Sequence, residues 1–172
     1  MTVAAGLLLL LAACSEPAQQ PEASSPGKTA ADTASQVQRG EYLVAIMGCN
    51  DCHSPKRPGP SGPEIIPERM LSGYPSDRPV VAFDRSLLQK GFAVFSPDLT
   101  AAAGPWGISF TGNLTPDETG IGAWTEEQFR KAVTEGKYKG LEGGRLLLPP
   151  MPLFNKLTRE DARAIFLYLK SL

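Results

Sequence analysis

Apolar residues recur at helical spacing shortly after the first 35 residues. One face of the segment 36–49 carries three apolar residues and a glycine, namely Val37, Gly40, Val44 and Met47. This spacing predicts a helix. A glycine inside a helix costs about 1 kcal/mol relative to alanine, so we interpret Gly40 as a position where another helix crosses closely.

Two more helices are predicted near the end of the chain. The last one has Thr158 as its N-cap, with Asp161 three residues on, and its apolar stripe consists of Ala162, Ile165, Phe166 and Leu169. The other begins with a capping box at 125–128 and ends at Gly136. Its inner face is predicted to carry Phe129, Ala132 and Val133.

The stretch between the first helix and the two later ones is rich in proline and glycine. Its apolar runs at 91–95 and 106–110 predict a small hairpin or isolated strands. So long a stretch with little regular structure is unusual in a compact domain, and we interpret it as wrapping around a cofactor. The fold is therefore expected to be mainly α, with few helices around one cofactor and a long loop-rich insertion.

The N-terminal pattern predicts export and lipidation. An uncharged apolar run at 3–13 is too short to span a bilayer and matches the apolar part of a secretory signal, although no Lys or Arg precedes it. It ends in Leu-Ala-Ala-Cys14, which resembles a bacterial lipobox; an ordinary signal with an incidental cysteine is the alternative. We expect a signal peptide at 1–13, a lipidated Cys14 with a flexible tether at 14–35, and one domain at 36–172.

Charge and cysteine usage narrow the function classes. Lys and Arg number 17 and Asp and Glu number 18, so nothing marks the chain as a nucleic-acid binder. Three cysteines leave no surplus thiol if Cys14 is lipidated and the other two share one site. The expected location is the periplasmic side of a bacterial membrane, either inner or outer.

The segment Cys49-Asn50-Asp51-Cys52-His53 carries the clearest chemistry. A CxxCH motif is the attachment pattern for c-type haem: Cys49 and Cys52 add to the vinyl groups as thioethers, and the adjacent His53 binds iron. No other histidine is present. A zinc site would need more ligands, and a redox dithiol would need a βαβ context. We therefore expect one covalent haem c.

The sixth iron ligand separates an electron carrier from an open-site haem protein. A methionine opposite histidine suits electron transfer. Met151 lies between prolines shortly before the last helix, in a backbone that proline makes rigid. Met70 has no such support and is expected in the core. Met151 is therefore the predicted ligand, and filling an irregular gap is its alternative role.

Together these residues identify a resemblance to class I mono-haem cytochromes c. The chain is most similar to bacterial membrane-associated cytochromes and to cytochrome c subunits of periplasmic dehydrogenases, over 36–55 and 110–172; the insertion from Lys56 to Ser109 is only weakly similar. The resemblance implies first and last helices that cross at nearly right angles, with Gly40 and Tyr168 at the crossing. It also implies a proline carbonyl, of Pro63 or Pro67, that accepts a hydrogen bond from His53.

Several polar residues are candidates for supporting roles. Trp124 and Arg145 are predicted to donate hydrogen bonds to the haem propionates, with Asn113 at the same edge. Core packing for Trp124, solvent exposure for Arg145 and turn formation for Asn113 are the alternatives. A second set of basic residues is a candidate for steering an acidic redox partner: Lys56, Arg57, Lys137 and Lys139.

The leading functional hypothesis is a lipid-anchored electron carrier rather than an enzyme. It would link a periplasmic dehydrogenase or a quinol-oxidising complex to a terminal oxidase. A fixed electron-transfer subunit of a dehydrogenase is one alternative. A haem enzyme or gas sensor with an open sixth position is another, although no distal histidine is available for acid–base chemistry.

Overall fold

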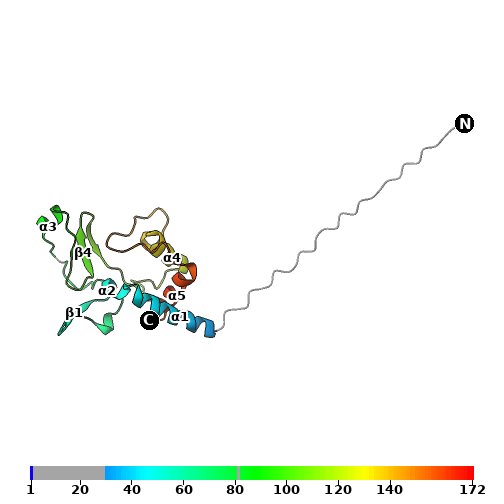
Figure 1. Cartoon of the computed structure of the whole chain (residues 1–172), viewed down its shortest axis with the longest axis horizontal. Helices are drawn as coiled ribbons and strands as arrows, with labels where there is room; N and C mark the ends of the chain where they lie inside the picture. Colours follow the sequence, from blue (N-terminus) through cyan, green and yellow to red (C-terminus); the bar gives the residue numbers. More distant parts are fainter. Residues whose placement is uncertain (2–29, 81) are drawn as a thin grey trace.

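The computed structural model describes residues 1, 30–80 and 82–172. The predicted signal peptide after Met1, Cys14 and most of the predicted tether lie outside these residues. Helices dominate what is described: α1 (Ala30–Ile46), α2 (Cys49–His53), α3 (Arg85–Gln89), α4 (Glu126–Glu135) and α5 (Arg159–Lys170). Helix α1 and the C-terminal α5 lie together, while the strands lie at the opposite side of the α2 turn (Figure 1). The expectation of a mainly helical domain is thus confirmed, and assignment to class I cytochromes c stays a prediction.

Helix α1 is longer at its start than the sequence pattern indicated. It begins at Ala30 rather than near 36, so residues 30–35 belong to the helix and not to a tether. Three of these six residues are alanines, which have the highest helix propensity, and Asp32 complements the positive end of the helix dipole. The helix ends at Ile46, and Gly48 adopts a left-handed conformation (φ 69°) before α2 begins.

The core forms where α1 crosses α5. A Cβ atom on Gly40 would lie 2.0 Å from the Ala164 carbonyl oxygen and 2.8 Å from the Tyr168 Cβ, so no residue larger than glycine fits without a shift. The predicted close contact of Gly40 with Tyr168 is confirmed. Around this crossing pack nine buried residues: Leu43, Val44, Leu71, Ile121, Phe129, Ala164, Ile165, Phe166 and Leu169.

The capping signals near the C-terminus are confirmed. Thr125 and Gln128 form the reciprocal capping box of α4, which ends at a left-handed Gly136. Thr158 caps α5 by accepting a hydrogen bond from the Asp161 N–H. Because both helices are amphipathic, they bury Phe129 and Phe166 against one another, with ring centroids 5.7 Å apart.

Two small antiparallel sheets occupy the insertion. Strands β1 (Lys56–Gly59) and β2 (Gly62–Ile65) form a hairpin in which Lys56 lies opposite Ile65; the sequence analysis did not predict it. The second sheet has the order β3 (Val94–Phe95), β4 (Ala101–Gly104), β5 (Gly107–Phe110). The two predicted apolar runs do contain strands, but they pair through β4 and not with each other. No helix within the described ranges is long and apolar enough to cross a bilayer.

Candidate haem-attachment site

Helix α2 is a single turn that holds the two motif cysteines. Cys49 and Cys52 are three residues apart and therefore lie on one side of the turn. Both are half-buried free thiols. Burial raises the pKa of Cys49 to about 11, and burial also raises the pKa of Cys52. The thiols are thus protonated at neutral pH, a state that binds metal ions poorly.

His53, the last residue of α2, is oriented by a backbone carbonyl. Its Nδ1 lies 2.8 Å from the carbonyl oxygen of Gly112. Because a carbonyl only accepts hydrogen bonds, Nδ1 carries the proton. Burial lowers the pKa of His53, and the bond to Gly112 opposes this shift only in part. The ring is therefore neutral, with the lone pair on Nε2 free to bind iron.

The partner of His53 differs from the expectation. Neither Pro63 nor Pro67 accepts its hydrogen bond. Pro63 is taken up in the β1–β2 hairpin, opposite Pro58, and Pro67 begins a short 3-10 helix (Pro67–Arg69). The segment that follows β5 carries Gly112 to the imidazole in their place.

Backbone hydrogen bonds hold three distant segments together around His53. The Gly73 N–H donates to the His53 carbonyl (2.8 Å), and the Tyr74 N–H donates to the Thr111 carbonyl (3.0 Å). The Leu114 N–H donates to the buried Leu71 carbonyl (2.9 Å). Segment 71–74 therefore lies between α2 and segment 111–114. It fixes the position of the Gly112 carbonyl relative to the His53 ring.

Ser54, the C-cap of α2, completes this support. Its hydroxyl is fully buried, donates to Asn50 Oδ1 (2.7 Å) and accepts from the Leu71 N–H (2.9 Å). The sequence pattern did not reveal the supporting roles of Ser54, Leu71 and Gly73. Their roles depend on contacts between remote segments, and the only local signal is the serine that directly follows the motif.

The alternative zinc site is not supported. Within the ranges 30–80 and 82–172, no three His, Cys, Asp or Glu side chains come close enough together to hold a metal ion. A structural zinc site normally needs four such ligands. Haem iron needs only two axial protein ligands, since the porphyrin supplies the other four, and the neutral His53 fits one of these positions.

The loop that carries Met151 is anchored on both sides. The Leu147 N–H donates to the Gly136 carbonyl (2.7 Å), and the Phe154 N–H donates to the Val133 carbonyl (3.0 Å), so both ends are tied to the end of α4. Met151 itself is half-buried. Met70, expected in the core, is 36% exposed, because Leu71 beside it takes the core position. Iron ligation by Met151 stays a prediction.

Large apolar side chains near Met151 are left uncovered. Leu146 and Leu153, on either side of it, are 65% and 54% exposed, and Leu141 is 47% exposed. These exposed leucines are available for contact with a bound ligand or a partner. The paired thiols of α2 and the neutral imidazole of His53 are the groups that would hold a haem.

The predicted propionate donors have partners within the protein. Asn113 Oδ1 accepts from the Thr115 N–H (2.9 Å) and hydroxyl, which is the turn chemistry considered as its alternative. Arg145 stacks over Tyr138, with its Cζ 3.9 Å from the ring centroid, and donates to the Leu146 carbonyl. Trp124 packs against the core. Contact of any of the three with propionates stays a prediction.

The four basic residues considered for partner steering differ in whether their side chains contact other groups of the protein. Lys56 donates to backbone carbonyls, and Lys137 pairs with Glu135 and Glu142. Lys139 lies near the Tyr138 ring, while Arg57 is exposed. The charges of Lys56 and Lys137 thus have hydrogen-bond or ion-pair partners within the domain.

Comparison with known proteins finds cytochrome c subunits of dehydrogenases. The chain is 30% identical over 136 residues to the fructose dehydrogenase cytochrome subunit of Gluconobacter japonicus. The matched residues make up 77% of this chain and 20% of that protein. It is 29% identical over 135 residues to the gluconate 2-dehydrogenase cytochrome c subunit of Pantoea cypripedii, and the match covers 77% of this chain and 22% of that protein. A stretch of 67 residues is 40% identical to the alcohol dehydrogenase (quinone) cytochrome c subunit of Gluconacetobacter polyoxogenes, covering 37% and 14%.

These similarities support the general class of cytochrome c subunits. The chain spans about a fifth of the length of the first two relatives. No family model matches it.

Proposed function

We propose that this protein is an electron-transfer cytochrome c that serves a dehydrogenase. Cys49 and Cys52 would hold one haem through thioethers, and His53 and Met151 would be the protein ligands of its iron. When bound, haem c supplies a one-electron couple at a potential that the axial ligands and their surroundings set. The chain itself is not an enzyme in this proposal.

One observation carries the proposal: the hydrogen bond from His53 Nδ1 to the Gly112 carbonyl at the end of a CxxCH turn. This bond fixes the tautomer and leaves Nε2 as the donor to iron. It also limits rotation of the ring, since the carbonyl is held by segment 71–74. A histidine that was merely part of the surface would need no such support.

The proposed place of the chain in electron flow rests on its relatives. They are named as cytochrome subunits of fructose, gluconate and quinone-dependent alcohol dehydrogenases. We infer that this chain accepts electrons from a partner dehydrogenase and passes them to a further redox protein or a terminal oxidase. Lipidation of Cys14 would hold it on the periplasmic side of a membrane.

The visible spectrum tests the axial ligands. Met151→Ala should abolish the weak far-red absorption band that the resemblance to class I cytochromes c implies for Met-ligated ferric haem, and it should let the reduced protein bind CO rapidly. Met70→Ala is the matched control, because it removes an equal side chain from an exposed site, and it should leave both properties unchanged. Rapid CO binding by the unaltered protein would instead favour an open-site haem enzyme or gas sensor.

A second experiment distinguishes a fixed subunit from a free shuttle. Mild-detergent extraction of the native membrane, followed by purification through a tag on this chain, should bring down a dehydrogenase in stoichiometric amount if the chain is a subunit. Isolation of the cytochrome alone, with reduction by an added dehydrogenase at low ionic strength, would favour the shuttle. The similarity to named subunits favours the first outcome.

A further inference from the structure

The side-chain ammonium of Lys56 lies among four backbone carbonyls. Its Nζ is 2.6 Å from the Asp51 oxygen, 3.0 Å from that of Ser54, 3.1 Å from that of Asp98 and 3.4 Å from that of Asn50. An ammonium has three N–H donors, so the longest contact, to Asn50, shares a donor with a shorter one. Lys56 is the first residue of β1, directly after the attachment turn.

Three of these carbonyls belong to the haem-attachment turn. Asn50 and Asp51 are the two residues between the motif cysteines, and Ser54 is the C-cap of α2. The carbonyls at the end of a helix carry partial negative charge, although that of Asn50 already accepts a hydrogen bond from the Ser54 N–H (3.2 Å). A cation that donates to them stabilises the turn that carries both thiols and His53.

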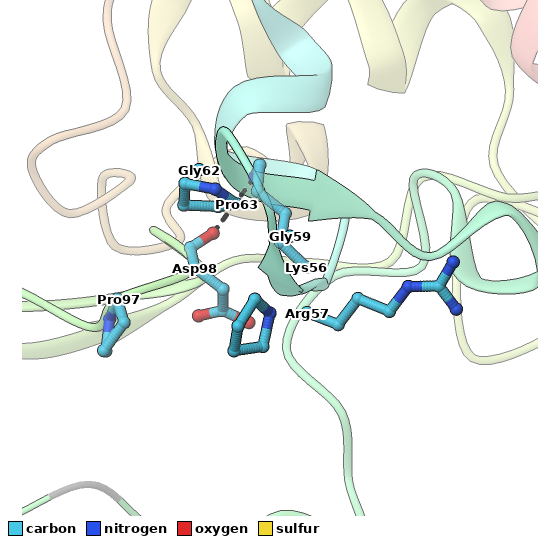
Figure 2. Close-up of a pocket in the computed structure, with 8 residues that line it drawn as sticks. Lys56, Arg57, Gly59, Gly62, Pro63, Pro97 and Asp98 are labelled. Atoms are coloured by element: carbon cyan, nitrogen blue, oxygen red, sulfur yellow. Dashed lines mark hydrogen bonds between the residues drawn. The ribbon is translucent and has the colours of Figure 1, made fainter.

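The fourth carbonyl belongs to a remote, rigid part of the insertion. Asp98 is 6% exposed. Its carboxylate accepts hydrogen bonds from Arg78 (2.6 Å), Ser96 (2.9 Å) and Thr100 (2.9 Å). Figure 2 shows the hydrogen bond that joins the Lys56 side chain of β1 to the backbone carbonyl of Asp98. The Asp98 loop is therefore held in place, and its backbone carbonyl accepts a hydrogen bond from Lys56 on the side away from α2.

We propose that Lys56 is a positioning residue for the haem site: it clamps the Cys49–His53 turn onto the Asp98 loop and holds a positive charge beside that turn. The inference rests on the proposed function, because it requires a haem on the turn. It also gives the insertion a role, because the insertion would support the turn that carries the predicted iron ligand His53. A fixed positive charge beside the turn that would hold the haem favours the reduced state of its iron.

The neighbouring Arg57 is a matched control. It carries the same charge on the next residue but is exposed, and both residues line a pocket of about 290 Å³. Replacing Arg57 changes the net charge of the protein without touching the four carbonyls.

The test compares the haem-loaded variants Lys56→Met, Lys56→Arg and Arg57→Met by redox titration. At a fixed potential, Lys56→Met should lower the ratio of reduced to oxidised protein three- to tenfold, about 30–60 mV for a one-electron couple. Lys56→Arg should restore most of this shift, and Arg57→Met should leave the potential within the error of the titration. Amide hydrogen exchange should accelerate in both segments 49–54 and 96–100 of Lys56→Met alone.

The outcomes separate the inference from the proposed function. Haem-loaded Lys56→Met with an unchanged potential and unchanged exchange would overturn the clamp while leaving the cytochrome intact. Wild-type protein without covalent haem would overturn the proposed function itself, and the clamp with it. If Lys56→Met does not accumulate, Lys56→Gln is titrated in its place. This variant keeps a shorter hydrogen-bond donor and removes the charge, and it must show the same shift in redox potential.

Discussion

The His53 imidazole and the Gly112 carbonyl are 59 residues apart in the chain and 2.8 Å apart in space. The contact exists because segment 71–74 packs between them and bonds to both sides. The orientation of the proposed iron ligand therefore depends on a segment that carries no ligand. This arrangement makes the supporting residues testable apart from the ligands themselves.

Gly73 is the most sensitive residue of that support. Its φ is +75°, and an added Cβ would lie 2.6 Å from the Gly112 carbonyl carbon and oxygen. Gly73→Ala should lower the free energy of unfolding by at least about 1–2 kcal/mol from backbone strain alone, and should also shift the redox potential by displacing the Gly112 carbonyl. Urea unfolding and redox titration measure the two effects.

Gly112→Ala is the control for this prediction. An added Cβ there would meet no atom within 4 Å, and the carbonyl would stay in place. Its free energy of unfolding should stay within about 0.5 kcal/mol of wild type. A Gly73→Ala protein as stable as Gly112→Ala would contradict the packing of segment 71–74 against segment 111–114.

Ser109 joins the second sheet to the loop that carries the predicted methionine ligand. Its hydroxyl donates to the Pro149 carbonyl at 2.7 Å, two residues before Met151. Ser109→Ala removes a bond worth about 1 kcal/mol, so the open state of the loop should become roughly fivefold more populated. Stopped-flow CO binding to the reduced protein should accelerate by that factor, whereas Ser61→Ala, at the exposed turn of the first hairpin, should have no effect.

The Asp98 carboxylate predicts a pH dependence of stability. Burial raises its pKa, but hydrogen bonds from Arg78, Ser96 and Thr100 outweigh burial and lower the pKa to about 2. Because the folded pKa lies below the unfolded value of 3.8, the contribution of Asp98 is fully present above about pH 4 and is lost as pH falls towards 2. Partial exposure of Arg78 reduces this contribution to about 1–2 kcal/mol.

Urea unfolding of Asp98→Asn against wild type checks this window. The difference in the free energy of unfolding should be constant from pH 7 to about pH 4 and should shrink between pH 4 and 2. Asp77→Asn, which breaks only the exposed pair with Arg69, should show little difference at any pH. A difference for Asp98→Asn that did not change with pH would mean that its charge is not the source of the stability.

The sequence predicted best the features that depend on neighbouring residues. The caps at Thr125 and Thr158, the left-handed Gly136 and the crossing at Gly40 all follow from local propensity or from one face of a helix. The start of α1 was placed too late because the polar and small residues at 30–35 resemble a tether in composition, although their alanines favour a helix.

The supporting contacts of the site could not be predicted in this way. The partner of His53 is a backbone carbonyl, which every residue has, and its identity depends on how segments 71–74 and 111–114 pair. Lys56 was considered only as a candidate for steering a redox partner, because its place in the sequence does not reveal the four carbonyls around it. Likewise, β4 is a run of alanines whose burial between two strands has no clear periodic signal.

The central claim is that Cys49 and Cys52 carry one covalent haem. Its most direct test is the mass of the denatured protein, after expression in a host that attaches haem to exported CxxCH proteins. The predicted result is the mature polypeptide plus one haem, and the polypeptide mass alone for the double variant Cys49→Ala, Cys52→Ala. A wild-type mass without haem, in a host that matures a control cytochrome c, would contradict the account.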